Sequence, residues 1–101
     1  MPETKKSLAR IALLYDYYSP MLTEHQKDAL DLYYNEDLSL AEIAENLGIT
    51  RQAVRDAIKQ GERKLFYFEE RLGFVERNEY ASRLITEGEY EKALEILARR
   101  K

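Results

Sequence analysis

Four polar side chains with the chemistry to contact nucleic acid lie close together in the middle of the chain: Arg51, Gln52, Arg55 and Lys59. A guanidinium group can make paired hydrogen bonds to guanine, and a carboxamide can make them to adenine. Apolar Val54, Ile58 and Leu65 recur among these residues at helical spacing. The pattern therefore predicts one helix whose apolar side is buried and whose polar side faces outward.

A second, shorter helix is predicted directly before this one. Ser39 is followed three residues later by Glu42, the spacing of a capping box, so a helix should begin after Ser39. Gly48 supplies the permissive backbone of a turn, and Thr50 can accept a hydrogen bond from the first N–H groups of the next helix. This order predicts a helix-turn-helix over residues 39–65, and an ordinary helical hairpin is the alternative.

Two more helices are predicted nearer the N-terminus. The first ends at Tyr18, before a Ser-Pro pair, and Ser7 is its predicted N-cap. Thr23 and Gln26 form a second capping-box pattern, and the helix that follows should run to about Asn35.

The polar helix is predicted to continue beyond the helix-turn-helix, over residues 51–72. An internal glycine, Gly61, is tolerated in a helix at a cost of about 1 kcal/mol relative to alanine, and Gly73 is the predicted C-cap. We therefore expect a helical domain over residues 1–73 and a helical hairpin over residues 74–101. The second helix of that hairpin is marked by apolar residues after the Glu87-Gly88 turn, namely Tyr90, Ala93, Leu94 and Leu97.

Composition favours an all-α protein of about one domain. The 101 residues include 45% apolar and 35% charged residues, but only four glycines and two prolines, which leaves little room for hairpin turns. The chain has no cysteine, so disulfides and thiolate zinc sites are excluded. No apolar run approaches the roughly twenty residues of a membrane span, and the N-terminus lacks the pattern of a signal peptide. We expect a cytoplasmic protein.

The charge balance weakens the case for tight DNA binding. The net charge is −3, and residues 39–65 carry five basic side chains against four acidic ones. Residues 23–38 carry five acidic side chains against Lys27 alone. Phosphate neutralisation supplies most non-specific affinity, so a free-standing DNA-binding protein usually has a basic excess. A protein-binding module that keeps the fold without DNA affinity is therefore an open alternative.

The residues of the common catalytic sites are missing. The four glycines are isolated and form no phosphate-binding loop, and His25 is the only histidine. Without a cysteine nucleophile or a partner for this histidine, neither a catalytic triad nor a metal centre is predicted. We expect a protein that is not an enzyme and needs no cofactor.

Consecutive aromatic residues, Phe66, Tyr67 and Phe68, give the distal part of the long helix more apolar surface than one small core needs. This excess favours a homodimer interface. Packing of the same residues on the first helix is the alternative.

Two resemblances bear on function. The segment LTEHQKDALDLYYNEDLSLAEIAENLGITRQAVRDAIKQGERKL resembles region 4 of bacterial sigma factors, which binds promoter DNA. The longer segment that begins RIALLYDYYSPMLTEHQ is similar to the YlxM family of small bacterial helix-turn-helix proteins, over residues 10–72. The tail from Phe74 onward does not follow the pattern of that family, so the resemblance is expected to end before it.

The genes of YlxM proteins typically lie beside those of the signal-recognition-particle GTPase and its receptor. The resemblance therefore implies a regulatory role in co-translational protein targeting, through DNA, the particle's RNA or its proteins. A stand-alone DNA-binding transcriptional regulator is the alternative. By position, the sigma-factor likeness implies five nucleic-acid-binding residues, with Lys59 toward phosphate: Thr50, Arg51, Gln52, Arg55 and Lys59.

Overall fold

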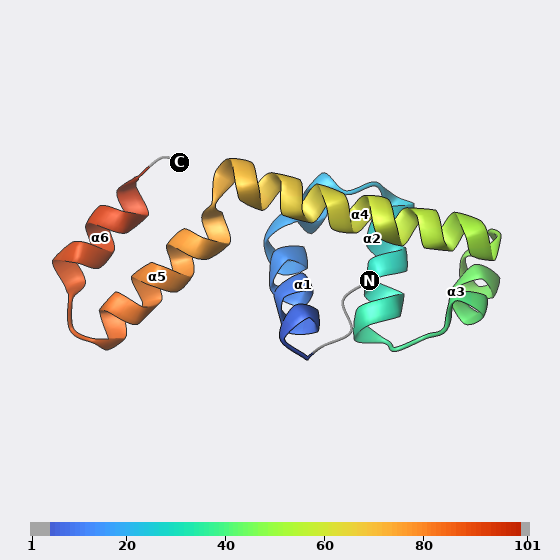
Figure 1. Ribbon diagram of the computed structural model, residues 1–101, viewed down its shortest axis with the longest axis horizontal. Coiled ribbons are helices and arrows are strands. Elements are labelled where there is room, and N and C mark those ends of the chain that lie inside the picture. The colour runs from blue at the N-terminus through green and yellow to red at the C-terminus, as the bar shows by residue number, and fades with distance from the viewer. Residues whose placement is uncertain (1–4, 100–101) are drawn as a thin grey trace. The chain divides into compact units, whose positions relative to one another are not determined.

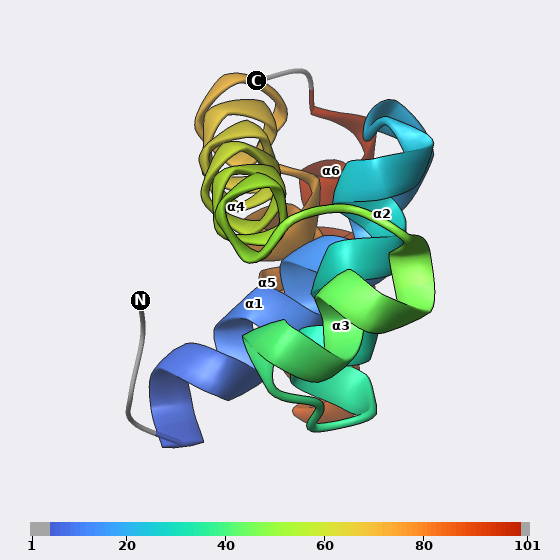
Figure 2. The same ribbon diagram turned by 90° about the vertical axis from the view of Figure 1, so that its right-hand side faces the viewer.

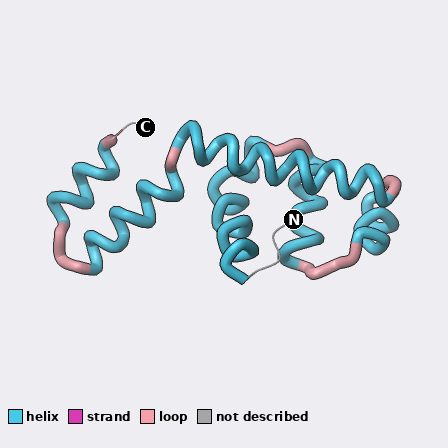
Figure 3. Tube along the Cα trace, in the orientation of Figure 1, coloured by secondary structure: helices cyan, strands magenta, loops and turns pink. Residues whose placement is uncertain are grey.

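The computed structural model describes residues 5–99, and it describes side chains from Leu8 onward. Within that span every regular element is helical (Figure 3), which confirms the all-α prediction. The elements are α1 (Lys5–Tyr18), the 3₁₀ turn η1 (Ser19–Met21), α2 (Glu24–Leu30), the π-helical η2 (Asp31–Asn35), α3 (Leu40–Leu47), α4 (Arg51–Leu72), α5 (Phe74–Thr86) and α6 (Tyr90–Ala98). The chain forms two compact units, Met1–Phe66 and Tyr67–Lys101.

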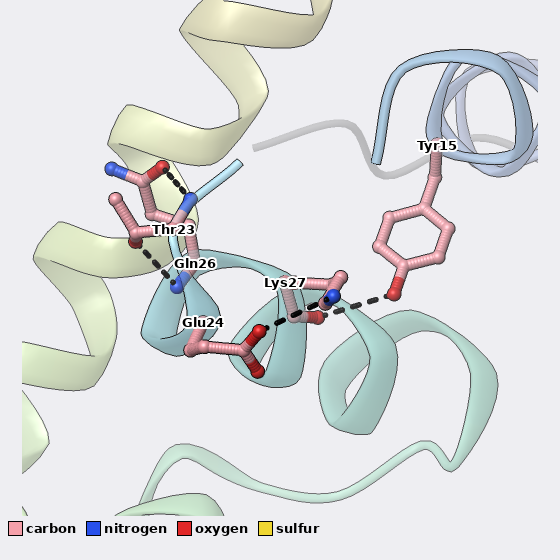
Figure 4. Close-up of polar contacts among 5 residues, drawn as sticks. All are labelled: Tyr15, Thr23, Glu24, Gln26 and Lys27. Atoms are coloured by element: carbon pink, nitrogen blue, oxygen red, sulfur yellow. Dashed lines mark hydrogen bonds and ion pairs between the residues drawn. The ribbon is translucent and has the colours of Figure 1, made fainter. Parts of the chain in front are cut away.

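The predicted capping box at the start of α2 is present. Oγ1 of Thr23 accepts from the Gln26 N–H at 3.2 Å, and Oε1 of Gln26 accepts from the Thr23 N–H at 3.1 Å (Figure 4). One turn later, the Tyr15 hydroxyl of α1 donates to the carbonyl oxygen of Lys27 at 3.4 Å. The helix continues through η2 and ends at Asn35, as predicted, although its last part is π-helical.

The first unit is built against one side of α4. Helices α1, α2 and α3 all lie on that side (Figures 1 and 2). The core between them consists of large apolar side chains that are almost fully buried: Ile11, Leu14, Tyr18, Leu30, Ile43, Val54, Ile58 and Leu65. The apolar stripe that the sequence predicts for the first half of α4 is therefore the side on which this unit is assembled.

The second unit contains the α5–α6 hairpin (Figure 1). Its core is small and consists of Ala81, Leu84, Ala93 and Ile96. The apolar residues after Gly88 correctly predicted a helix, but they did not identify its buried side. Leu94 and Leu97, which belong to the predicting pattern, remain 68% and 45% exposed.

One predicted helix end is wrong and another is confirmed. Helix α1 begins at Lys5, so Ser7 lies inside the helix and is not its N-cap. Gly73 adopts the left-handed conformation, with φ of 65°, and its N–H donates to the Glu69 carbonyl oxygen at 2.8 Å. Gly73 therefore ends α4 as predicted and also precedes the first residue of α5.

Two of the three consecutive aromatic residues near the end of α4 are exposed. Phe66 is 43% exposed and Tyr67 is 51% exposed. The Arg10 guanidinium of α1 lies over the Phe66 ring, with Cζ at 5.9 Å from the ring centroid. The exposed ring surface is what the dimer prediction requires, and dimerisation itself stays a prediction.

Candidate nucleic-acid interface

The turn between α3 and α4 is formed by backbone hydrogen bonds at a left-handed glycine. Gly48 has φ of 70° and ψ of 33°, and its N–H donates to the Ala44 carbonyl oxygen. The Ile49 N–H donates to the same oxygen at 3.1 Å. A β-carbon placed on Gly48 would meet no atom within 4 Å, so the backbone conformation is the reason for glycine here. The bend that a helix-turn-helix requires is present.

Thr50 starts α4. Its hydroxyl oxygen accepts from the Ala53 N–H at 3.0 Å, and its carbonyl oxygen accepts from the Val54 N–H at 3.0 Å. The side chain therefore serves as the N-cap that the sequence predicts. The hydroxyl oxygen of Thr50 already accepts a hydrogen bond in the cap. A contact of this exposed side chain with nucleic acid would therefore use the hydroxyl proton as a donor.

The first half of α4 is held by a buried apolar row. Val54 and Ile58 are fully buried, and Ile43 of α3 is fully buried as well. Because these side chains fill the core, the opposite side of the helix has a fixed orientation within the first unit. A ligand bound there would meet side chains on a rigid support.

The predicted contact residues of α4 are all exposed: Arg51, Gln52, Arg55 and Lys59. At 3.6 residues per turn, Arg51, Arg55 and Lys59 form one row along the helix, and Gln52 begins the adjacent row. The structure thus brings these side chains together on one outward side. We call this group, Arg51, Gln52, Arg55 and Lys59, the α4 polar face.

No ion pair between described residues neutralises a cation of the α4 polar face. Between described residues the ion pairs are Lys27–Glu24 at 3.5 Å and Lys92–Glu89 at 3.4 Å, and neither includes α4. Arg51, Arg55 and Lys59 therefore keep their charge available for an anionic partner.

Gln52 is already engaged on the helix surface. Its Nε2 donates to Oδ1 of Asp56 at 2.9 Å, one turn further along the row. One amide proton and the carbonyl oxygen of Gln52 remain to be shared with a base edge. Asp56 itself places a negative charge beside the α4 polar face, which opposes phosphate binding.

Helix α3 adds only negative charge to this region. Glu42 and Glu45 are exposed, and residues 39–50 contain no lysine or arginine. Two hydrogen bonds with Ser39 hold the pKa of Glu42 below its ordinary value. The bond from the Ser39 backbone N–H has the larger effect, and the bond with the Ser39 side chain has the smaller one. Glu42 is therefore ionised at neutral pH, and the basic side chains of residues 39–65 all belong to α4.

The contacts that hold α4 against α2 could not be found from residue spacing. Gly61 is buried and lies against Leu30, and Nε2 of Gln26 donates to Oε1 of Gln60 at 3.4 Å. The sequence contained one indication of this contact, the glycine at position 61. A glycine inside a strongly periodic helix often marks a place where another segment packs closely against the helix.

A further polar contact joins α4 to η2. The Tyr34 hydroxyl of η2 donates to the Glu62 carboxylate. The pKa of the Tyr34 phenol is raised above its ordinary value. Burial is the largest cause, and the hydrogen bond to Glu62 is the second. The contact ties the π-helical end of α2 to the middle of α4.

In residues 5–99, no three histidine, cysteine or carboxylate side chains are grouped so that they could hold a metal ion. None of the helices in that span has the length and apolar character needed to cross a membrane.

Comparison with known proteins identifies the family. The profile of a family described as "Putative helix-turn-helix protein, YlxM / p13 like" matches residues 5–93. The match runs through α5 and into α6, so the expectation that the family pattern ends before Phe74 is wrong. The alternative of an ordinary helical hairpin is not supported, because the turn at Gly48 and the family both correspond to a helix-turn-helix.

Individual relatives agree with the family match. The chain is 49% identical over 82 residues to the UPF0122 protein STH1464 of Symbiobacterium thermophilum, which covers 81% of this chain and 77% of the relative. It is 48% identical over 82 residues to a UPF0122 protein of Desulforamulus reducens, with coverage of 81% and 70%. A UPF0122 protein of Clostridium kluyveri is 51% identical over 67 residues, with coverage of 66% and 60%. The chain belongs to the UPF0122 family of YlxM/p13-like helix-turn-helix proteins.

Proposed function

We propose that this protein is a non-enzymatic regulator that binds nucleic acid through the α4 polar face and acts in the signal-recognition-particle pathway of the cytoplasm. The observation that carries the proposal is the exposed row of Arg51, Arg55 and Lys59 on a helix anchored by Val54 and Ile58. Guanidinium and ammonium groups supply phosphate contacts, and Arg and Gln supply hydrogen bonds to base edges.

The electrostatics favour a weak or assisted nucleic-acid contact. Three cations on α4 are flanked by Asp56 and by the carboxylates of α3. Neutralising about three phosphates gives a modest non-specific affinity and a logarithmic salt slope of about −3 on duplex DNA. A protein with this footprint gains from a second binding surface on the same target, which an RNA–protein particle offers and bare DNA does not.

The link to the signal recognition particle rests on family membership. Genes of YlxM proteins typically lie beside those of the particle's GTPase and its receptor, and this neighbourhood supports a role in co-translational targeting. The particle's RNA is the partner we favour, because it presents phosphates next to protein. The particle's proteins and DNA near its genes are the other partners of this proposal.

A stand-alone transcriptional regulator is the second candidate. The observation that favours it is the pairing of arginine and glutamine in the first turns of α4, the side chains suited to guanine and adenine edges in the major groove. A third candidate, a protein-binding module without nucleic-acid affinity, is favoured by the net charge of −3.

One titration separates these candidates. The full chain is titrated with the particle's RNA and with random duplex DNA between about 50 and 200 mM salt. Preference for the particle's RNA supports the proposal, whereas sequence-selective DNA binding supports the second candidate. No binding to either, with capture of the particle's GTPase in the absence of RNA, supports the third.

A cellular test addresses the pathway. Deletion of the gene should alter membrane-protein targeting or the expression of the targeting genes. A deletion strain in which both are unchanged would overturn the pathway assignment, whatever the protein binds in solution.

A further inference from the structure

The second unit contains a cavity of about 440 Å³ whose lining is rich in arginine. Its size lies within the range of about 300–1,000 Å³ that is typical of ligand pockets. The side chains that matter for binding come from α5 and from the residues in and just after α6: Glu76, Arg77, Tyr80, Arg83, Ile96 and Arg99. We call this cavity the arginine pocket.

The charge of the arginine pocket is positive in a protein that is negative overall. Three guanidinium groups face one carboxylate, that of Glu76. Neither ion pair found between described residues includes any of these four side chains. Guanidinium groups stay protonated at any physiological pH, so the pocket keeps an excess of about two positive charges.

Several contacts hold the lining in place. Nη2 of Arg77 donates to the Leu72 carbonyl oxygen at 3.2 Å, and its Cζ lies 5.6 Å from the centroid of the Phe74 ring. Cζ of Arg83 lies 5.6 Å from the centroid of the Tyr80 ring. Holding two of the three guanidinium groups, those of Arg77 and Arg83, in the free protein lowers the entropy cost of binding a ligand.

The start of α5 is held by a buried carboxylate. Oε1 of Glu69 accepts from the Val75 N–H at 3.1 Å, and Oε2 accepts from the Glu76 N–H at 3.0 Å. Glu69 is only 6% exposed, so this cap is shielded from water. It orients the helix that carries Arg77, Tyr80 and Arg83.

We propose that the arginine pocket binds a phosphate group carried by a nucleotide, either free or at the end of a single-stranded nucleic acid. The planar guanidinium fork matches the oxygens of a phosphate in paired hydrogen bonds. A terminal phosphate carries about −1.5 to −2 charges at neutral pH, which matches the excess in the pocket better than the single charge of a carboxylate. Tyr80, 42% exposed, gives the pocket an aromatic wall beside which a base can stack.

This site is separate from the α4 polar face and needs none of its residues. It goes beyond the proposed function, because it assigns a second anionic ligand to the part of the chain that follows the helix-turn-helix. The test is therefore designed so that the two sites fail independently.

Calorimetric titrations of the full chain with defined probes test the proposal. The probes are adenosine 5′-monophosphate, adenosine, and one single-stranded oligonucleotide with and without a 5′-phosphate. We expect binding of adenosine 5′-monophosphate and at least about tenfold weaker binding of adenosine, because charge-assisted hydrogen bonds are lost. For the oligonucleotides the same difference is expected in an R51A background, in which the contact at the α4 polar face is weakened. Binding of the mononucleotide identifies a free nucleotide as sufficient, whereas binding of the phosphorylated oligonucleotide alone identifies a nucleic-acid end.

Variants locate the binding. R83Q and R99Q should each weaken phosphate-probe binding at least about tenfold. R71Q is the matched control, since Arg71 is an exposed arginine of the same unit that does not line the pocket. R51A, on the α4 polar face, should leave the binding of adenosine 5′-monophosphate unchanged and can alter only the binding of the oligonucleotide. Arg99 lies beyond the last residue of α6, so R99Q should leave the fold intact. Thermal unfolding of this variant checks that it does.

Three results would overturn the proposal. One is wild-type protein that binds neither phosphorylated probe. Another is folded R83Q and R99Q variants that bind as tightly as R71Q. The last is a higher affinity of the pocket for a short acidic peptide than for either phosphorylated probe.

Discussion

A β-carbon placed on Gly61 of α4 would lie 2.8 Å from Cδ1 and 3.3 Å from Cγ of Leu30 in α2. Leu30 is itself only 1% exposed, so its side chain has little room to move away. The glycine therefore has a packing role, because it lets the backbone of α4 approach α2 closely. This contact therefore sets how closely α4, which carries the α4 polar face, packs on α2 in the first unit.

G61A should destabilise the protein even though alanine is the better helix former. The helix gains about 1 kcal/mol from the substitution, but overpacking against Leu30 costs about 1–3 kcal/mol. We expect a net loss of about 1 kcal/mol in the free energy of unfolding, measured by urea denaturation. In an L30A background the clash is absent, so G61A should become stabilising there. The same effect in both backgrounds would contradict the packing role.

Removal of the Glu69 carboxylate should loosen the start of α5. E69A leaves the N–H groups of Val75 and Glu76 without their acceptor, and each hydrogen bond to a charged group contributes about 1.5–3 kcal/mol. Amide hydrogen exchange at Val75 and Glu76 should therefore become faster by at least about tenfold. E70A is the control, since Glu70 is the exposed neighbour on the same helix. Equal protection in both variants would show that the cap is not needed.

The Tyr34–Glu62 contact should make stability sensitive to alkaline pH. The pKa of Tyr34 is raised in the folded protein, so the folded state holds the phenol proton more tightly than the unfolded state. The resulting stabilisation is fully present below the unfolded pKa of about 10 and is lost as pH rises above it. The difference in unfolding free energy between wild type and Y34F should therefore stay constant up to about pH 9 and shrink as pH rises above about 10. Y90F, which removes the phenol of a tyrosine that is 63% exposed, is the control. A pH-independent difference for Y34F would exclude the linkage.

Arg51 and Lys59 should affect nucleic-acid binding in different ways. R51A should reduce base preference by about 1–3 kcal/mol, because a paired contact to a base edge is lost. K59A should weaken binding to all sequences alike and change the logarithmic salt slope by about 1. R71A, which removes an exposed arginine from the last turn of the same helix, should leave both properties unchanged. Binding that is identical for wild type and all three variants would exclude the α4 polar face as the contact surface.

The charge of Asp56 should limit nucleic-acid affinity. D56N keeps a partner for Gln52, whose Nε2 donates to Asp56 at 2.9 Å, but it removes a negative charge beside the α4 polar face. We expect affinity to rise about threefold at low salt and the gain to shrink as salt screens the charge. E70Q makes the same change of charge near the end of the helix and should have no effect. An unchanged affinity of D56N would place Asp56 outside the contact.

Local signals predicted most of the helix ends. The capping boxes at Thr23 and Ser39, the left-handed turn at Gly48 and the cap at Thr50 are all present. Each depends on hydrogen bonds between residues at most five positions apart, so the sequence contains the whole interaction. Ser7 shows the limit of this reasoning, because a residue type that favours a cap can also lie inside a helix.

What the sequence by itself determined was the set of helices, their turns and the outward side of α4, since periodicity alone separates Val54 and Ile58 from Arg51 and Arg55. The tertiary structure decided which helices meet, through contacts between residues far apart in the chain. Gly61 against Leu30 is one such contact, and Tyr34 with Glu62 is another. The arginine pocket arises in the same way, because Arg83 and Arg99 line one cavity only after α5 and α6 have packed. Spacing along a helix encodes its faces, but the partner of each face depends on how the whole chain folds.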